Sequence, residues 1–153
     1  MAGHNKDLAL LCRVKARLCA LPIACVAEIM RRLPIDPMPG APPFVLGLAI
    51  IRGAPMPVVD VAQLFEDERS DSAYLVSTLL GNARVALAVD SVLGVRPIPD
   101  GSLQALPSLL ENAASDVVSR IGALDDELLL VLSNVRVVPQ DVWDTLEAAS
   151  AAA

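Results

Sequence analysis

GLAIIRGAPMPVVDV, residues 47–61, contains the clearest strand–turn–strand pattern in the chain. Two aliphatic runs, residues 44–51 and 56–61, flank the turn RGAP, and such runs around Gly and Pro predict two strands joined by a tight turn. An arginine in an aliphatic neighbourhood is costly unless its guanidinium reaches water, a carboxylate or a partner. Spacing alone therefore favours a solvated hairpin tip for Arg52 and leaves a binding role as the alternative, with Gly53 permitting close approach of another surface.

The residues before this segment predict a further hairpin. Residues 8–14 and 17–23 are strand-like and flank a short turn. A tight turn there sets Cys12 directly opposite Cys19, so a disulfide is conceivable on proximity alone. The chain has three cysteines, an odd number, and no secretion signal is recognised. Two buried, reduced thiols are therefore the favoured interpretation, and Cys25 is interpreted in the same way.

Three segments follow with different expectations. Residues 23–32 have an apolar spacing that predicts a short helix rather than a strand. Residues 33–43 contain five of the twelve prolines, which predicts an extended connection. The charged run at residues 66–71 predicts a solvated loop and marks the expected boundary between two halves.

The second half of the chain repeats this strand rhythm. Strands and two helices are predicted there: strands at residues 73–80, 84–89, 91–98, 121–124 and 127–133, a short helix near 106–113 and a C-terminal helix at about 139–149. The pattern ALxIxxVxxI of residues 20–29 recurs 66 residues later as ALxVxxVxxV. We predict one all-β domain with two lobes, about residues 8–70 and 71–138, between which strands can cross. Small barrels are favoured because closure removes exposed sheet edges.

Composition excludes several classes of protein. The chain of 153 residues is 54% apolar with a mean hydropathy of +0.54, which excludes global disorder. Its uncharged aliphatic runs are too short for a membrane-spanning helix. The net charge of −6 and the aromatic content of 3% argue against a basic or base-stacking surface for nucleic acid. Without a recognisable signal peptide, the expected location is the cytoplasm.

The sequence offers little for catalysis or for metal and cofactor binding. The single histidine is His4, and no zinc spacing, EF-hand loop, Walker loop or GxGxxG motif occurs, so no metal or cofactor is expected. Asp60 and Asp90 each end an aliphatic strand, as the carboxylates of an aspartic protease do, but neither precedes the glycine turn which that chemistry needs. The favoured interpretation is that each carboxylate caps the element after its strand and that the chain is not an enzyme.

The chain resembles the CheW family, the adaptor proteins of bacterial chemosensory arrays. The matching motifs follow the family's order and cover about residues 8–146: ALPI at 20–23, VAEI at 26–29, PGAP at 39–42, FVLG at 44–47, RG at 52–53, PVVDV at 57–61, AVDSV at 88–92 and IG at 121–122. The family usually has Asn-Leu before the Arg-Gly pair. This chain has Ile50 and Ile51 there, so a polar contact is expected to be missing.

The resemblance implies two intertwined, five-stranded SH3-like barrels with short helices and a C-terminal helix, and no catalytic activity. It implies two partners, the cytoplasmic hairpin tip of chemoreceptors and the regulatory domain of the histidine kinase CheA. It also implies a cytoplasmic location at membrane-bound arrays, without direct membrane insertion. Asp60 is implied to be structural. By motif position, the implied receptor-binding residues are Val26, Glu28, Gly47, Arg52 and Gly53.

Several alternatives stay open. A receptor helix in a groove between the lobes would place Glu28 and Arg52 at the rim, where charges set register, but the two side chains could instead pair with each other within the fold. The kinase contacts cannot be placed residue by residue. The same fold could serve an array that controls pili or another non-motility output, and a purely structural subunit would self-assemble without the kinase.

Overall fold

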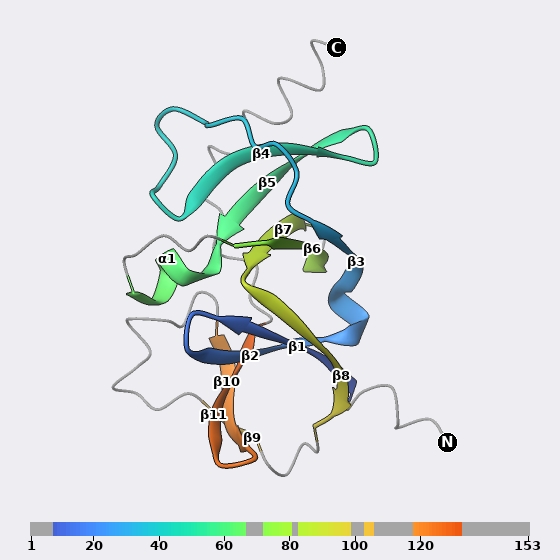
Figure 1. Ribbon diagram of the computed structural model, residues 1–153, viewed down its shortest axis with the longest axis vertical. Coiled ribbons are helices and arrows are strands. Elements are labelled where there is room, and N and C mark those ends of the chain that lie inside the picture. Colours follow the sequence, from blue (N-terminus) through green and yellow to red (C-terminus); the bar gives the residue numbers. More distant parts are fainter. Residues whose placement is uncertain (1–7, 67–71, 81–82, 99–102, 106–117, 133–153) are drawn as a thin grey trace.

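The computed structural model describes residues 8–66, 72–80, 83–98, 103–105 and 118–132. Strands dominate this part of the chain (Figure 1), so the predicted all-β class is confirmed. Its helical segments are the 3-10 turn η2 (Ile23–Cys25) and the helix α1 (Val61–Glu66). The strands are β1 (Leu8–Val14), β2 (Arg17–Pro22), β3 (Val26–Arg31), β4 (Val45–Ile51), β5 (Ala54–Asp60), β6 (Tyr74–Leu80), β7 (Ala83–Val89), β8 (Ser91–Pro97), β9 (Leu103–Ala105), β10 (Val118–Leu124) and β11 (Glu127–Leu132).

The strands form two sheets that follow one another along the long axis of the molecule (Figure 1). The five-stranded sheet has the order β3-β6-β7-β5-β4, and the six-stranded sheet has the order β8-β1-β2-β11-β10-β9. The pairs β5–β7 and β2–β11 are parallel, and the others are antiparallel. Each sheet therefore contains the same plan of five strands, and the short strand β9 adds a sixth to one of them.

Each sheet contains one strand that follows, in the sequence, a strand of the other sheet. β3 follows β2 but pairs with β6, whereas β8 follows β7 but pairs with β1. The two exchanged pairings share one register: Leu8 pairs with Pro97, and Tyr74, 66 residues after Leu8, pairs with Arg31, 66 residues before Pro97. The sequence echo has the same offset and spans β2–β3 and β7–β8. The two lobes are thus joined by two strand crossings.

The hairpins β4–β5 and β10–β11 correspond in the same way. Val45 pairs with Val59, and the residues 73 positions later, Val118 and Leu132, also pair. The register shifts immediately after this first pair in both hairpins. The two lobes are therefore repeats of one strand plan, and each position in one hairpin has a counterpart in the other.

Apolar side chains pack in three clusters. Successive side chains of β1 point to opposite faces of the strand and so belong to two of these clusters. Leu10, Cys12 and Val14 belong to a cluster that draws on both sheets and on α1, here called the interlobe core. Ala9 and Leu11 point the other way, into a cluster within the six-stranded sheet. The third cluster lies within the five-stranded sheet. Complete burial of one such aliphatic side chain contributes about 1.5–3 kcal/mol, so the interlobe core holds the lobes together strongly.

The helix predicted for residues 23–32 is wrong. Only η2 at Ile23–Cys25 is helical, and Val26–Arg31 forms β3. Exposure along β3 alternates, so that Glu28 is half-buried whereas Ile29 is exposed, and this two-residue period is that of a strand. Pairing with β6, which is distant in sequence, decides the structure here over the local helical spacing.

The two candidate protease aspartates bind backbone amides in different places. Asp60 accepts a hydrogen bond from the Ala62 amide at 3.2 Å and so caps α1, as predicted. Asp90 instead accepts from the Lys15 amide at 2.6 Å. It therefore holds the β1–β2 turn, a contact with a distant part of the chain that was not predicted.

Some expected elements fall outside the described residues. These are the short helix near 106–113, the C-terminal helix at 139–149, and most of the charged run at 66–71. His4 also lies outside them. Conversely, α1 and β9 were not predicted, because each is short and β9 is defined by pairing with β10.

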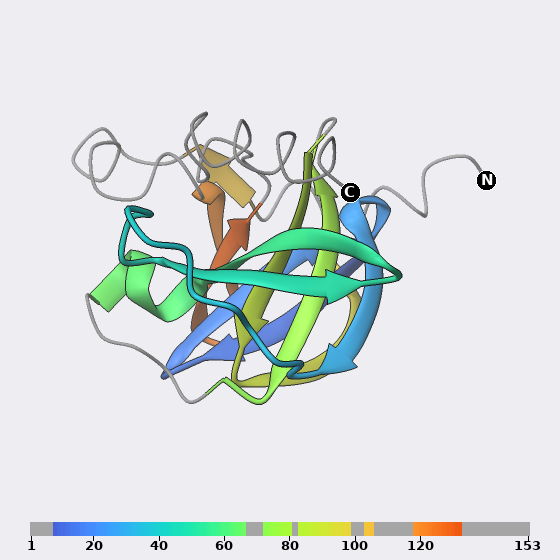
Figure 2. The same ribbon diagram turned by 90° about the horizontal axis from the view of Figure 1, so that it is seen from above.

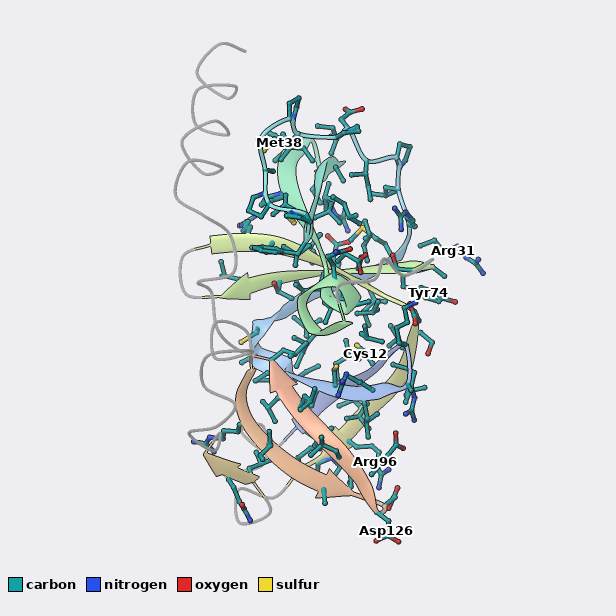
Figure 3. The ribbon with its side chains drawn as sticks, turned by 90° about the vertical axis from the view of Figure 1, so that its left-hand side faces the viewer. Cys12, Arg31, Met38, Tyr74, Arg96 and Asp126 are labelled. Atoms are coloured by element: carbon teal, nitrogen blue, oxygen red, sulfur yellow. The ribbon has the colours of Figure 1, made fainter. Side chains whose placement is uncertain are left out.

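Cys12 and Cys19 pair directly across β1 and β2, as predicted, and both are free thiols. They lie in the interlobe core near the middle of the molecule, where Cys12 is labelled in Figure 3. Burial raises the pKa of each thiol to about 12. Cys25 is half-buried, and its pKa is also raised by burial.

These environments predict that alkylation of the folded protein modifies Cys25 first. The thiolate is the reacting form, so Cys12 and Cys19 are protected both by their raised pKa and by lack of access. Iodoacetamide treatment near neutral pH, followed by peptide mass spectrometry, should give one adduct at Cys25 and leave the other two thiols unmodified until denaturant is added. Equal modification of all three thiols in the folded state would contradict the described packing.

Candidate functional site

The tip of the β4–β5 hairpin positions two of the predicted site residues. Ile51 pairs with Ala54, so Arg52 and Gly53 are the two turn residues between the strands. Both have left-handed backbones, with φ of 55° for Arg52 and 77° for Gly53, the geometry of tight turns that match strand twist. A Cβ on Gly53 would meet nothing within 4 Å. The turn conformation, and not crowding, therefore favours glycine there.

β3 brings Glu28 to the same tip. Arg52 Nε donates to Glu28 Oε1 and Arg52 Nη2 donates to Glu28 Oε2, each at 2.8 Å, so the pair is bidentate. These hydrogen bonds lower the pKa of the Glu28 carboxyl and raise the pKa of the Arg52 guanidinium. The Arg52 side chain remains 78% exposed. The two side chains do pair within the fold, and their pair lies at the surface, where it adds little stability.

A pocket of about 140 Å³ lies beside this ion pair. Ile51 and Met56, which belong to the core of the five-stranded sheet, supply apolar surface to it. Leu79 of β6, which is 45% exposed, and Arg84 of β7 also line the pocket. The pocket thus combines aliphatic surface with one carboxylate and two guanidinium groups, which suits the binding of a protein side chain.

Gly47 lies on β4, away from the tip, against the proline-rich linker of residues 33–43. The Asp36 and Leu48 backbones exchange two hydrogen bonds of 2.8 Å, which fasten the linker to the edge of β4. A Cβ on Gly47 would lie 2.0 Å from the carbonyl oxygen of Asp36 and 2.9 Å from the Cα of Pro37. Figure 2 looks onto the β4–β5 hairpin from above and shows the linker beside it. Gly47 therefore admits the linker backbone.

Val26 lies where β3 begins and packs against the interlobe core together with Val92, its counterpart at the start of β8. Beyond this point, β3 and β8, which lie on the same side of the molecule in Figure 1, carry exposed aliphatic residues. They are Ile29, Leu93 and Val95, exposed by 47%, 52% and 48%. We call these three residues the apolar stripe.

The structure therefore brings Glu28, Arg52 and Gly53 together and places Val26 on the same strand as Glu28, whereas Gly47 serves the linker. Sequence reasoning missed the pocket residues from β6 and β7 and the apolar stripe. Ile29 was missed because residues 26–31, VAEIMR, do not alternate in polarity and their spacing was interpreted as helical. Leu79 and Arg84 pair across β6 and β7 in a part of the sequence without any motif, and they were not detectable.

No group of three or more His, Cys, Asp or Glu side chains among the described residues could hold a metal ion. No helix in the described part of the chain is long and apolar enough to cross a membrane.

Comparisons with known proteins agree with this geometry. A family model described as the CheW-like domain matches residues 8–141. The chain is similar to the chemotaxis protein CheW of Rhizobium meliloti (strain 1021), with 25% identity over 122 residues, which cover 78% of this chain and 79% of that protein. It is also similar to the probable chemotaxis protein CheW of Rhizobium etli, with 26% identity over 113 residues, covering 72% and 73% of the two chains. Among solved structures, the scaffolding protein TtCheW from Thermoanaerobacter tengcongensis has the same fold, with a TM-score of 0.73, 23% identity, and coverage of 83% of this chain and 88% of that chain.

Proposed function

The chain belongs to the CheW-like domain family, and from this premise we propose that it couples chemoreceptors to the histidine kinase CheA. The family is one of non-catalytic scaffolding adaptors in chemotaxis, so the chain is an adaptor and not an enzyme. The proposed place of action is the cytoplasmic face of receptor arrays, which the chain reaches through its partners.

The bidentate Glu28–Arg52 pair at the exposed hairpin tip carries this proposal. An ion pair this exposed contributes little to folding, so its well-defined geometry is better explained by a surface that a partner contacts. The pair also holds the β4–β5 tip against β3, which fixes the outline of the pocket beside it. Charges in such a place set register and on-rate more than raw affinity.

The apolar stripe supplies the burial that charges alone do not give. A receptor tip is helical in this proposal, and an amphipathic helix binds by laying its apolar face against aliphatic side chains. Ile29 on β3 and Val95 on β8 lie at corresponding places in the two lobes, and in this proposal one helix contacts both of them. Val26 anchors β3 to the interlobe core, and Gly53 allows the turn conformation at the hairpin tip. Gly47 acts indirectly, because it admits the linker backbone.

Signalling follows from geometry in this proposal. The receptor changes between two conformations, and the adaptor binds both the receptor and the kinase. A shift in the conformational equilibrium of the receptor therefore shifts that of the kinase, without any reaction on the adaptor. The two strand crossings and the shared interlobe core join the lobes. In this proposal, a displacement at the receptor surface is transmitted through them to the kinase surface.

Removal of the Arg52 guanidinium tests the receptor-binding surface. In Arg52→Ala, we expect the affinity for a receptor tip fragment to fall about tenfold, since the register-setting charge is lost while the aliphatic contacts remain. Titration of labelled fragment with purified protein, followed by fluorescence anisotropy, measures this change. Because the ion pair adds little to folding, the thermal unfolding curve should hardly move.

Arg120→Ala is the matched control. Arg120 is also an exposed arginine, and it lies on β10, which is neither the hairpin tip nor one of the two strands of the apolar stripe. This variant should bind the receptor fragment like the unchanged protein. Unchanged affinity in Arg52→Ala, or an equal loss in both variants, would remove Arg52 from the site.

A further inference from the structure

One of the two arginines that line the pocket beside the Glu28–Arg52 pair is left without a counter-charge. Arg84 lines this pocket from β7 and is exposed. Its guanidinium forms no ion pair or hydrogen bond with any residue that the structure describes. Both oxygens of Glu28 already accept hydrogen bonds from Arg52, at 2.8 Å each. The pocket therefore carries one positive charge that the described part of the chain does not compensate.

The other lobe has an arginine in the same cross-strand pair and neutralises it. Leu79 pairs with Arg84 across β6 and β7. The residues 66 positions earlier are Arg13 and Leu18, which pair across β1 and β2. Each pair thus joins a leucine to an arginine, in opposite order. Arg13 forms an ion pair with Glu127, to which both of its terminal nitrogens donate hydrogen bonds.

The five-stranded sheet has no carboxylate at the place that corresponds to Glu127. Glu127 begins β11, and Ala54, 73 positions earlier, begins β5 and is exposed. Ala54 lies on the same face of β5 as Met56, which lines the pocket together with Arg84. The chain thus supplies to Arg13 a carboxylate that it does not supply to Arg84. This difference indicates that the counter-charge of Arg84 comes from a second molecule.

We propose that Arg84 determines specificity in receptor binding, because its guanidinium binds the carboxylate of one acidic side chain of the receptor tip. The inference rests on the proposed function, since Arg84 shares its pocket with the Glu28–Arg52 pair assigned there to the receptor. A guanidinium that loses water on binding needs an opposite charge, so a carboxylate is selected over an amide or an aliphatic group. The aliphatic lining of the pocket packs against the methylene part of the same side chain, and it consists of Ile51, Met56 and Leu79.

Double-mutant cycles between Arg84→Ala and a receptor tip fragment test this assignment. In fluorescence anisotropy, Arg84→Ala should bind the fragment at least about tenfold more weakly, and Arg84→Lys should lose less, since it keeps the charge but not the planar fork. Each acidic residue of the fragment is then replaced in turn by its amide. One replacement should weaken binding to the unchanged protein and make no further difference in Arg84→Ala, because both changes remove the same contact. Arg120→Ala, the control for Arg52→Ala, should show no such coupling.

Ala54→Glu supplies the missing carboxylate from within the chain. The new side chain should pair with Arg84 as Glu127 pairs with Arg13, and so reduce the affinity for the receptor fragment by a similar factor. Ala54→Gln is the matched control, since it adds the same bulk without the charge, and it should bind like the unchanged protein. Circular dichroism should report the same fold for every variant.

Three results would overturn the inference and leave the proposed function intact. They are equal affinity of Arg84→Ala and the unchanged protein, the absence of any acidic position of the fragment that is coupled to Arg84, and equal affinities of the two Ala54 variants. A fragment that does not bind the unchanged protein at all would contradict the proposed function, and the inference with it.

Discussion

Replacement of Gly47 by alanine should cost about 3 kcal/mol or more of unfolding free energy, a large loss for a single methyl group. The added Cβ would lie 2.0 Å from the Asp36 carbonyl oxygen, 2.7 Å from its carbon and 2.9 Å from the Pro37 Cα, all of them backbone atoms. Prolines flank this part of the linker, so its backbone has little freedom to move aside. Relief of the clash would require breaking the paired 2.8 Å hydrogen bonds between Asp36 and Leu48. The φ of +144° at Gly47 adds strain for any other residue.

Gly53→Ala provides the control for this prediction. Gly53 also has a positive φ, but a Cβ there meets nothing within 4 Å, so only the conformational cost of about 1 kcal/mol remains. Urea unfolding of the two variants should therefore separate them clearly. Equal losses would mean that the linker does not lie against β4 as described. The comparison also separates two explanations of the glycine in the FVLG motif, namely packing of the linker and contact with a partner. If Gly47 is required for packing, Gly47→Ala reduces partner binding only because it destabilises the fold.

Most strands could be predicted from the sequence because their signals are local. The alternation in β1 and the aliphatic runs of β4, β5 and β7 each end at a turn residue, and no long-range information is needed to find them. The expected turn at RGAP proved to be Arg52 and Gly53 alone, since β5 already begins at Ala54. Local chemistry also predicted the cap that Asp60 provides for α1.

The features that depend on distant partners could not be predicted in this way. β3 was interpreted as a helix because the strand it pairs with, β6, lies more than forty residues later in the sequence. Ile29, for example, pairs with Val76. The sequence echo was visible, but nothing in it specified that β3 and β8 exchange sheets. The contact of Asp90 with the Lys15 amide depends on this exchange, since β8 brings Asp90 to the β1–β2 turn.

The candidate site was predicted in part, and through the family resemblance. Glu28 and Arg52 were named together, and their bidentate contact was one of two open interpretations. The role of Gly47 in admitting the linker was not foreseen, because the close approach of Asp36 is a tertiary contact. The apolar stripe was missed for a different reason, namely that an exposed aliphatic residue in a chain so rich in them carries no distinctive pattern.

The largest functional effect is expected for recruitment of the kinase to receptor-bearing membranes. In this account the adaptor offers surfaces and no chemistry, so its whole contribution is to hold two proteins that otherwise do not stay together. The proposed receptor surface comprises the Glu28–Arg52 rim and the apolar stripe, and the remaining barrel surfaces are the ones proposed for the kinase. Recruitment should therefore require the adaptor in stoichiometric amounts, because a binding protein is not recycled as a catalyst is.

Co-sedimentation of purified kinase with vesicles bearing receptor signalling domains measures this claim most directly. Without the adaptor, the kinase should stay in the supernatant, and it should move to the pellet in proportion to the adaptor added until the receptor sites are filled. Val95→Asp should abolish this transfer, because a carboxylate in the apolar stripe removes the burial on which receptor binding depends. A kinase that pellets equally without the adaptor, or an adaptor that pellets with the receptor and leaves the kinase behind, would contradict the account.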